Sequence, residues 1–123
     1  MLQDRRSFPR HTIDCPVEVL LPDAPDTVYA GSCRGLSRTS IQLECPADLI
    51  PAMLRQRTLP YRCTLCFTLP WDAQPFQVAA QLVTHRRLSQ QHYRLVLLLR
   101  HADSAQEARL ERLLAAQLPP GLD

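Results

Sequence analysis

"FQVAAQLVTHRRL", residues 76–88, and "HYRLVLLLR", residues 92–100, are the stretches that decide the fold class of this chain. Both are rich in valine, leucine and aromatic residues, and turn-forming residues bound each of them, which is typical of strands. Four further runs share this character: residues 15–21, 28–36, 40–45 and 61–69. Short connections without long helical patterns between the six runs favour an antiparallel barrel or sandwich over a parallel sheet.

The end of the chain has a different pattern, because "DSAQEARLERLLAAQL" places its apolar residues at helical spacing. Ser104 and Glu107 match a capping box, so we expect a helix within residues 103–118, from about Ser104 to Leu118. Its apolar stripe is expected to cover an open end of the barrel. A shorter helical turn is expected within residues 47–57, where Pro51 opposes a long helix. The predicted fold is therefore all-β with a C-terminal helix, in the form of a six-stranded antiparallel β-barrel.

The length of 123 residues and the apolar content of 46% are those of one domain with a single core. We expect one domain over residues 1–123, with a flexible arginine-rich arm at 1–11, the barrel at 12–100 and the helix at 103–118. No stretch approaches the roughly 18 apolar residues of a membrane span, and the first twenty residues lack the order of a secretory signal. The sequence thus predicts a cytoplasmic protein without a membrane span.

The cysteines do not indicate a metal or redox site. Cys63 and Cys66 form a C-x-x-C, but they lie in a strand-like run, where residues three apart point to opposite faces. A zinc site would need a second pair of ligands at suitable spacing, and the sequence has none. An odd total also argues against a disulfide framework. We therefore expect no metal and no cofactor, and we interpret all five as small buried apolar residues: Cys15, Cys33, Cys45, Cys63 and Cys66.

Positive charge is concentrated at the start of the chain, where "DRRSFPR" (4–10) holds three arginines although the net charge is only +2. Pro9 favours an extended or turned backbone, so the guanidinium groups of Arg6 and Arg10 can fold over one bound anion. A second anion-friendly stretch is "GLSRTS" (35–40), whose hydroxyl and backbone N–H groups can donate to an acceptor. The small net charge and the lack of interleaved aromatic residues argue against a nucleic acid polymer as partner.

The order of these motifs resembles that of the PilZ domain, the receptor module for the bacterial second messenger cyclic di-GMP. Its first motif, R-x-x-x-R, is matched by Arg6-Ser-Phe-Pro-Arg10, with Arg5 as an extra basic residue beside it. Its second motif, D/N-x-S-x-x-G, is matched in part by "GLSRTS", which keeps Ser37 but has Gly35 for Asp/Asn and Ser40 for Gly. Val96 also stands where the family's "Y-R-x-G" strand has Gly. The resemblance covers nearly the whole chain.

The resemblance implies that the chain binds cyclic di-GMP and signals to a protein effector not identified by the sequence. It also implies that a Gly35 without an acceptor weakens binding, and that Ser40 is strained if that position needs a positive φ. The alternative is an adaptor of the same fold, for example in motility or surface-appendage control, that binds partners but no nucleotide. No arrangement of nucleophile, acid and base indicates an enzyme. The residues expected to bind the ligand are Arg5, Arg6, Arg10, Gly35, Ser37, Arg38 and Ser40.

Overall fold

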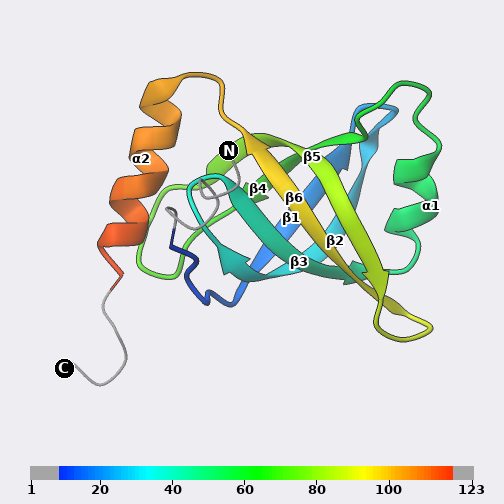
Figure 1. Ribbon diagram of the computed structural model, residues 1–123, viewed down its shortest axis with the longest axis horizontal. Coiled ribbons are helices and arrows are strands. Elements are labelled where there is room, and N and C mark those ends of the chain that lie inside the picture. The colour runs from blue at the N-terminus through cyan, green and yellow to red at the C-terminus, as the bar shows by residue number, and fades with distance from the viewer. Residues whose placement is uncertain (1–8, 118–123) are drawn as a thin grey trace.

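A computed structural model of the chain, which describes residues 9–117, contains a closed antiparallel barrel with a helix at each end (Figure 1). The strands follow one another around the barrel in the order β1-β2-β3-β6-β5-β4. Their bounds are β1 Cys15–Leu21, β2 Ala24–Leu36, β3 Ser40–Pro46, β4 Arg62–Phe67, β5 Phe76–Arg87 and β6 His92–Arg100. This confirms the predicted fold, a six-stranded antiparallel barrel with a C-terminal helix.

The barrel core follows from the alternation of apolar residues along each strand. In β6, Leu95, Leu97 and Leu99 are buried, while the residues between them face outward. Cys63 is likewise buried in β4, whereas Cys66 is only partly buried. Because the side-chain period of a strand is two, one apolar face per strand suffices to fill a closed barrel.

Strand β2 is longer than the sequence predicts, since it begins at Ala24 rather than at residue 28. The added residues extend the β1–β2 hairpin beyond the core, where Ala24 pairs with Leu21 after an irregularity in the ladder. They are mostly exposed, so they lack the apolar alternation by which a strand is recognised from sequence.

The first helix, α1 (Leu49–Leu54), closes one end of the barrel with Leu49, Ile50 and Met53 buried. Pro51 is its third residue, counted after the N-cap Asp48. A backbone N–H in the first turn has no partner within the helix, so proline there removes no hydrogen bond.

The second helix, α2 (Ser104–Ala115), lies at the opposite end of the barrel and buries Leu110 and Leu114 (Figure 1). It begins as predicted, but its N-cap is Asp103 rather than Ser104. The carboxylate of Asp103 accepts a hydrogen bond from the backbone N–H of Gln106 at 2.8 Å. The side chain of Gln106 accepts from the N–H of Ala102, the residue before the N-cap, at 2.7 Å, so the two bonds resemble a capping box that begins one residue earlier than expected. The helix ends at Ala115, short of the expected Leu118, which lies outside the described residues.

Within residues 9–117, no helix is long and apolar enough to cross a membrane.

Candidate ligand-binding site

A hollow of about 590 Å³ lies on the outside of the barrel, beside the turn that joins β2 to β3. Four of its residues are polar and belong to this turn or to the segment before β1. The other three are apolar and come from β5 and β6, so the hollow has one polar and one apolar wall. Its lining residues are Arg10, Ser37, Thr39, Ser40, Val83, Val96 and Leu98.

The turn is held in shape by the hydroxyl of Ser37, the one buried polar side chain among the described residues. The Ser37 oxygen accepts hydrogen bonds from the backbone N–H groups of Thr39 (3.2 Å) and Ser40 (3.1 Å). The N–H of Ser37 donates to the carbonyl of Ser40 at 2.8 Å, which closes the turn. The hydroxyls of Thr39 and Ser40 line the hollow and provide its neutral hydrogen-bonding groups.

Arg10 extends across Gly35, which lies at the end of β2. A Cβ atom built on Gly35 would be 3.2 Å from Cδ of Arg10 and 3.5 Å from its Cγ. The same position would be 3.5 Å from Oε1 of Gln42, which is the register partner of Gly35 on β3. The absent side chain of Gly35 therefore leaves space that the stem of Arg10 occupies. The two short backbone bonds between His11 and Leu36, at 2.8 and 2.9 Å, fix the segment that carries Arg10.

Arg38 turns away from the polar wall and binds α2. Its guanidinium lies 2.9 Å from a carboxylate oxygen of Glu111 and 3.3 Å from one of Glu107. His101 contacts the carbonyl oxygen of Arg38 through Nε2 at 2.7 Å. The side chains of this turn thus have different roles. Thr39 and Ser40 face the hollow, whereas Arg38 links the turn to the C-terminal helix.

Of the seven residues expected to bind ligand, the structure brings Arg10, Ser37 and Ser40 to one hollow, with Gly35 beneath Arg10. Arg5 and Arg6 lie outside the described residues, as do all but the last residues of the arm expected at 1–11.

The condition under which Ser40 would be strained, a positive φ at this position, is not met. No residue other than glycine in the described part of the chain has a positive φ, so serine adopts this position without a steric penalty. The Ser40 hydroxyl also lies 3.1 Å from that of Ser37, a contact that glycine would lose.

Four residues of the hollow were not predicted as site residues: Thr39, Val83, Val96 and Leu98. Val83 is the extra residue of a β-bulge, because the β5–β6 register shifts between Leu82 and Thr84. A bulge redirects a side chain without leaving a mark in the apolar pattern of the strand. Val96 did carry a signal, since it replaces a glycine of the family pattern, and its side chain forms part of the apolar wall.

Among the described residues, those that line the hollow include one cation and no carboxylate, so this part of the site favours an anion. Beneath it, the Cys33 thiol donates to the carbonyl of Gly35 at 3.6 Å. Its hydrogen bond with Cys15 and its burial raise the pKa of Cys33, so this thiol stays neutral.

Glu44, a carboxylate on β3 close to β2, is paired with arginines outside the hollow. The Glu44 side chain accepts from Arg94 at 2.8 Å and lies 3.4 Å from Arg34, and the hydrogen bond from Arg94 lowers the pKa of Glu44. Among residues 9–117, no group of three His, Cys, Asp or Glu side chains is arranged to hold a metal ion.

Comparison with known proteins gives a consistent result. The family model described as "PilZ domain" matches residues 4–116. No curated protein is similar enough to match. Among solved structures, the chain resembles the PilZ domain with c-di-GMP of YcgR from Escherichia coli, at 16% identity and a TM-score of 0.65, covering 92% of this chain and 91% of that one.

Two longer proteins contain a similar domain. The PlzA protein of Borreliella burgdorferi, in complex with c-di-GMP, shows 16% identity and a TM-score of 0.58, over 85% of this chain and 47% of that one. The motility inhibitor MotI of Bacillus subtilis shows 11% identity and a TM-score of 0.64, over 93% of this chain and 53% of that one. The chain spans about half of each of these proteins. At such low identity the likeness supports the fold and not the ligand.

Proposed function

Because the chain belongs to the PilZ domain family, we propose that it is a cytoplasmic receptor that binds cyclic di-GMP and signals the binding to a protein partner. The observation that carries the proposal is the hollow in which Arg10 meets the polar turn of residues 37–40. PilZ domains are regulatory receptor modules, so the proposal assigns no catalytic residue and no metal or cofactor.

The chemistry of the hollow suits a molecule with two phosphates and two guanines. Arg10 can pair with a phosphate or with the guanine O6 and N7 atoms, and its guanidinium plane can stack on a base. Val83 and Leu98 offer an apolar surface for the face of a base, while Thr39 and Ser40 can donate to phosphate oxygens. Arg5 and Arg6 would add further cationic groups from the segment before Arg10.

The guanine edge is the weaker part of the proposed site. In the family motif a carboxylate or amide accepts from the guanine N1 and N2 donors, and Gly35 has neither. The side-chain amide of Gln42 lies next to this position, and its oxygen can take over part of that role. We therefore expect binding that is weakened, by about 1–3 kcal/mol for one lost contact, rather than abolished.

The signalling half of the proposal rests on Arg38. This residue belongs to the turn and pairs with Glu107 and Glu111 of α2. A ligand that moves the turn therefore weakens or strengthens these ion pairs with the helix. Trp71 provides a probe for such a change, since it is the only tryptophan and its indole N–H donates to the carbonyl of Leu113 in α2 at 2.8 Å. A shift of tryptophan emission on adding cyclic di-GMP, lost in Arg38→Ala, would support this coupling.

The decisive experiment is calorimetric titration of the full chain with cyclic di-GMP. We expect saturable heat with the wild-type protein and an affinity lower by about 1.5–3 kcal/mol, or roughly ten- to a hundredfold, in Arg10→Ala. Arg100→Ala, which removes an exposed arginine outside the hollow, is the matched control and should bind like the wild type. No heat at high micromolar ligand for any of the three proteins would reject the receptor proposal.

Gly35 and Ser40 favour the second candidate, a PilZ adaptor that binds a protein partner without the nucleotide. Gly35 lacks the guanine acceptor of the family motif, and Ser40 replaces the glycine that keeps the family's turn open for the ligand. This adaptor would fold and dock normally but would give no heat with cyclic di-GMP, even after Gly35→Asp.

A further inference from the structure

Two more hollows lie on the barrel, and both adjoin the connection between α1 and β4. The first, of about 560 Å³, is lined mainly by polar and charged residues: Pro22, Asp23, Arg55, Gln56, Arg57, Thr58, Leu59, Pro60 and Arg62. The second, of about 550 Å³, is mainly apolar and is lined by Leu54, Leu59, Pro60, Tyr61, Leu82, Val83 and His85. Leu59 and Pro60 line both hollows, so the two adjoin, and together they are called the groove; Val83 also lines the candidate ligand site, which therefore adjoins the groove.

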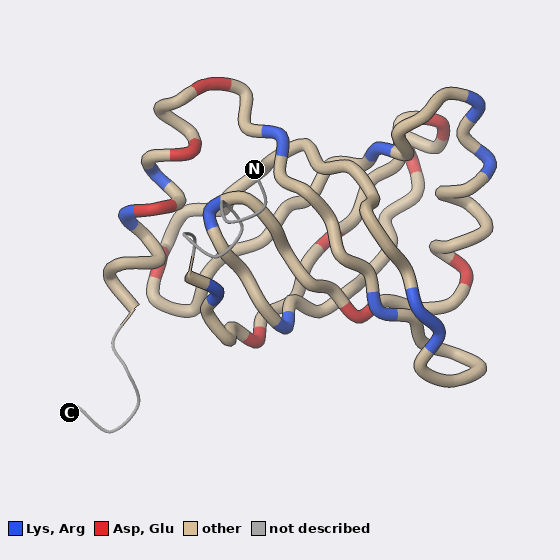
Figure 2. The backbone as a smooth tube through the Cα atoms, viewed as in Figure 1, with Lys and Arg blue, Asp and Glu red and all other residues tan. Residues whose placement is uncertain are grey.

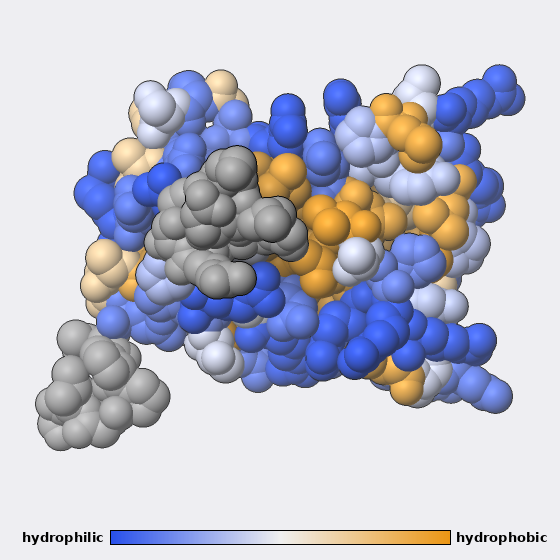
Figure 3. Space-filling view, viewed as in Figure 1, coloured by the Kyte–Doolittle hydropathy of each residue, from blue (hydrophilic) through white to orange (hydrophobic). Residues whose placement is uncertain are grey.

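The middle of this groove exposes apolar side chains, and burying them against a partner would be favourable. Leu59 is 74% exposed, Val83 55% and Leu54 37%. Figure 3 shows apolar residues gathered over β5 and β6 and continuing toward α1, framed by hydrophilic ones. An apolar patch with a polar frame on a soluble domain is typical of a protein contact surface.

The exposed side chains are held in place rather than carried on a loose loop. The Gln56 side chain makes two hydrogen bonds to the backbone of Arg62, donating to its carbonyl at 2.7 Å and accepting from its N–H at 2.9 Å. These bonds clamp the ends of the segment that presents Leu59. Val83 is fixed by the β-bulge in β5. A preformed surface lowers the entropy lost on binding.

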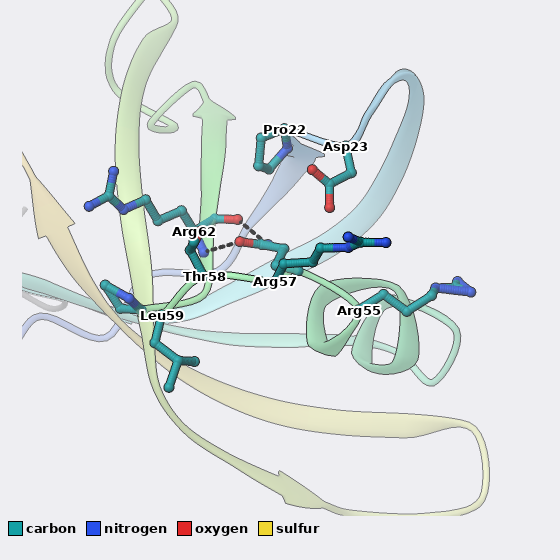
Figure 4. A pocket seen from close by; sticks show the side chains of 9 residues that line it. Pro22, Asp23, Arg55, Arg57, Thr58, Leu59 and Arg62 are labelled. Atoms are coloured by element: carbon teal, nitrogen blue, oxygen red, sulfur yellow. Dashed lines mark hydrogen bonds between the residues drawn. The ribbon is translucent and has the colours of Figure 1, made fainter.

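The charge beside the apolar patch is positive and available. Arg55, Arg57 and Arg62 make no ion pair with any residue in the described part of the chain, and Asp23 is the only acid in the lining of that hollow. Figure 2 shows several basic positions at the end of the barrel that α1 covers, with acidic positions between them. In Figure 4 the side chain of Arg62 points away from those of Arg55 and Arg57. Diverging guanidinium groups do not enclose one small anion, but they match acidic groups spread along a chain.

We propose that this groove docks a segment of a partner protein in which apolar side chains alternate with or adjoin Asp and Glu residues. The apolar side chains of the segment pack on Leu54, Leu59 and Val83, and its carboxylates reach the arginines beside them. This deepens the proposed function and rests on it in one respect: since Val83 lines both the groove and the nucleotide hollow, cyclic di-GMP bound in that hollow alters the docking surface directly.

The test uses a displayed library of random twelve-residue peptides, selected on the full-length protein, followed by anisotropy titrations of the most enriched peptide. We expect enriched peptides to combine apolar with acidic residues. Leu59→Glu should weaken their binding at least tenfold, and Arg57→Glu should weaken it more at low than at high salt. The matched controls are Leu88→Glu, at a residue 38% exposed outside the groove, and Arg100→Glu, and both should bind within twofold of the wild type.

Three results would overturn the docking proposal. The first is enrichment of peptides without acidic residues, and the second is a peptide affinity that Leu59→Glu leaves unchanged. The third is self-association of the protein that Leu59→Glu abolishes, because a second copy would then be the occupant. Displacement of the peptide by duplex DNA, with equal loss in Leu59→Glu, would likewise assign the surface to another class of partner.

The nucleotide dependence is tested by repeating the titrations with cyclic di-GMP. We expect the peptide affinity to change severalfold in the wild type and to stay constant in Arg10→Ala. If the nucleotide gives no calorimetric heat while the peptide still binds, the receptor function fails and the docking surface stands. If the nucleotide binds but leaves the peptide affinity unchanged, the coupling through Val83 is refuted.

Discussion

Gly35→Asp is the substitution that tests the proposed site most directly, because it restores the acceptor that the family motif has at this position. The new Cβ would lie 3.2 Å from Cδ of Arg10, so the Arg10 side chain must shift by a few tenths of an ångström. Arg10 is exposed and its side chain is flexible, and Gly35 does not have the left-handed backbone that would strain an L residue. The substitution is therefore expected to be tolerated.

The gain in affinity can be bounded from two opposing effects. Hydrogen bonds from the guanine N1 and N2 groups to a carboxylate contribute about 1.5–3 kcal/mol. Against this, the new carboxylate pairs with Arg10 in the free protein, and such an exposed ion pair contributes about 0–1 kcal/mol, part of which is lost when the ligand binds. The net expectation is about 1–2 kcal/mol, which corresponds to a five- to thirtyfold tighter Kd.

Calorimetric titration with cyclic di-GMP measures this gain, and Gly35→Ala is the matched control. Alanine places the same Cβ against Arg10 but adds no acceptor, so its affinity should equal or fall slightly below that of the wild type. If Gly35→Asp binds no tighter than Gly35→Ala, the guanine edge is not at Gly35 and the proposed orientation of the ligand is refuted. If neither protein gives heat, the adaptor becomes the better candidate.

Three other predictions concern stability, thiol reactivity and pocket size. The pKa of Glu44 is lowered from its ordinary value near 4.5, chiefly by Arg94, so its stabilising contribution is present above that pH and is lost as the pH falls through the lowered value. Acid unfolding of Glu44→Gln, followed by circular dichroism, should therefore be less steep below pH 4.5 than that of the wild type, and an unchanged profile would contradict this. Of the five cysteines only Cys66 is not buried, so we expect one fast-reacting thiol with a thiol reagent in the native protein and five in denaturant, whereas several fast thiols would show that the barrel opens. Val96→Gly should raise the affinity for cyclic di-GMP by widening the hollow while it lowers the free energy of unfolding by about 1–2 kcal/mol, as chemical denaturation would measure, and a loss of both would mean that Val96 contacts the ligand.

The sequence predicts the barrel well because alternation of apolar residues is a local property, readable within each strand. It also locates the polar turn, since Gly, Ser and Thr cluster there. It does not predict that Arg38 binds Glu111, 73 residues away, because only the closed barrel brings the turn beside α2. Nor does it predict Val83 in the pocket, since a bulge changes the face of one residue and leaves the composition of the strand unaltered.

A ligand bound beside the polar turn can affect a partner in two ways, through the ion pairs of Arg38 with α2 or through Val83. Arg38 binds carboxylates that are 35% and 57% exposed, so each ion pair contributes about 0–1 kcal/mol, and Leu110, Leu114 and Trp71 hold α2 independently. A ligand that withdraws Arg38 from both pairs would therefore shift the docking equilibrium of α2 by about fivefold per kcal/mol lost, without releasing the helix outright. The route through Val83 works differently, because this side chain lines both the ligand hollow and the groove. A ligand bound next to Val83 changes the surface that a partner in the groove contacts. Such a partner can therefore respond to the nucleotide even if α2 does not move.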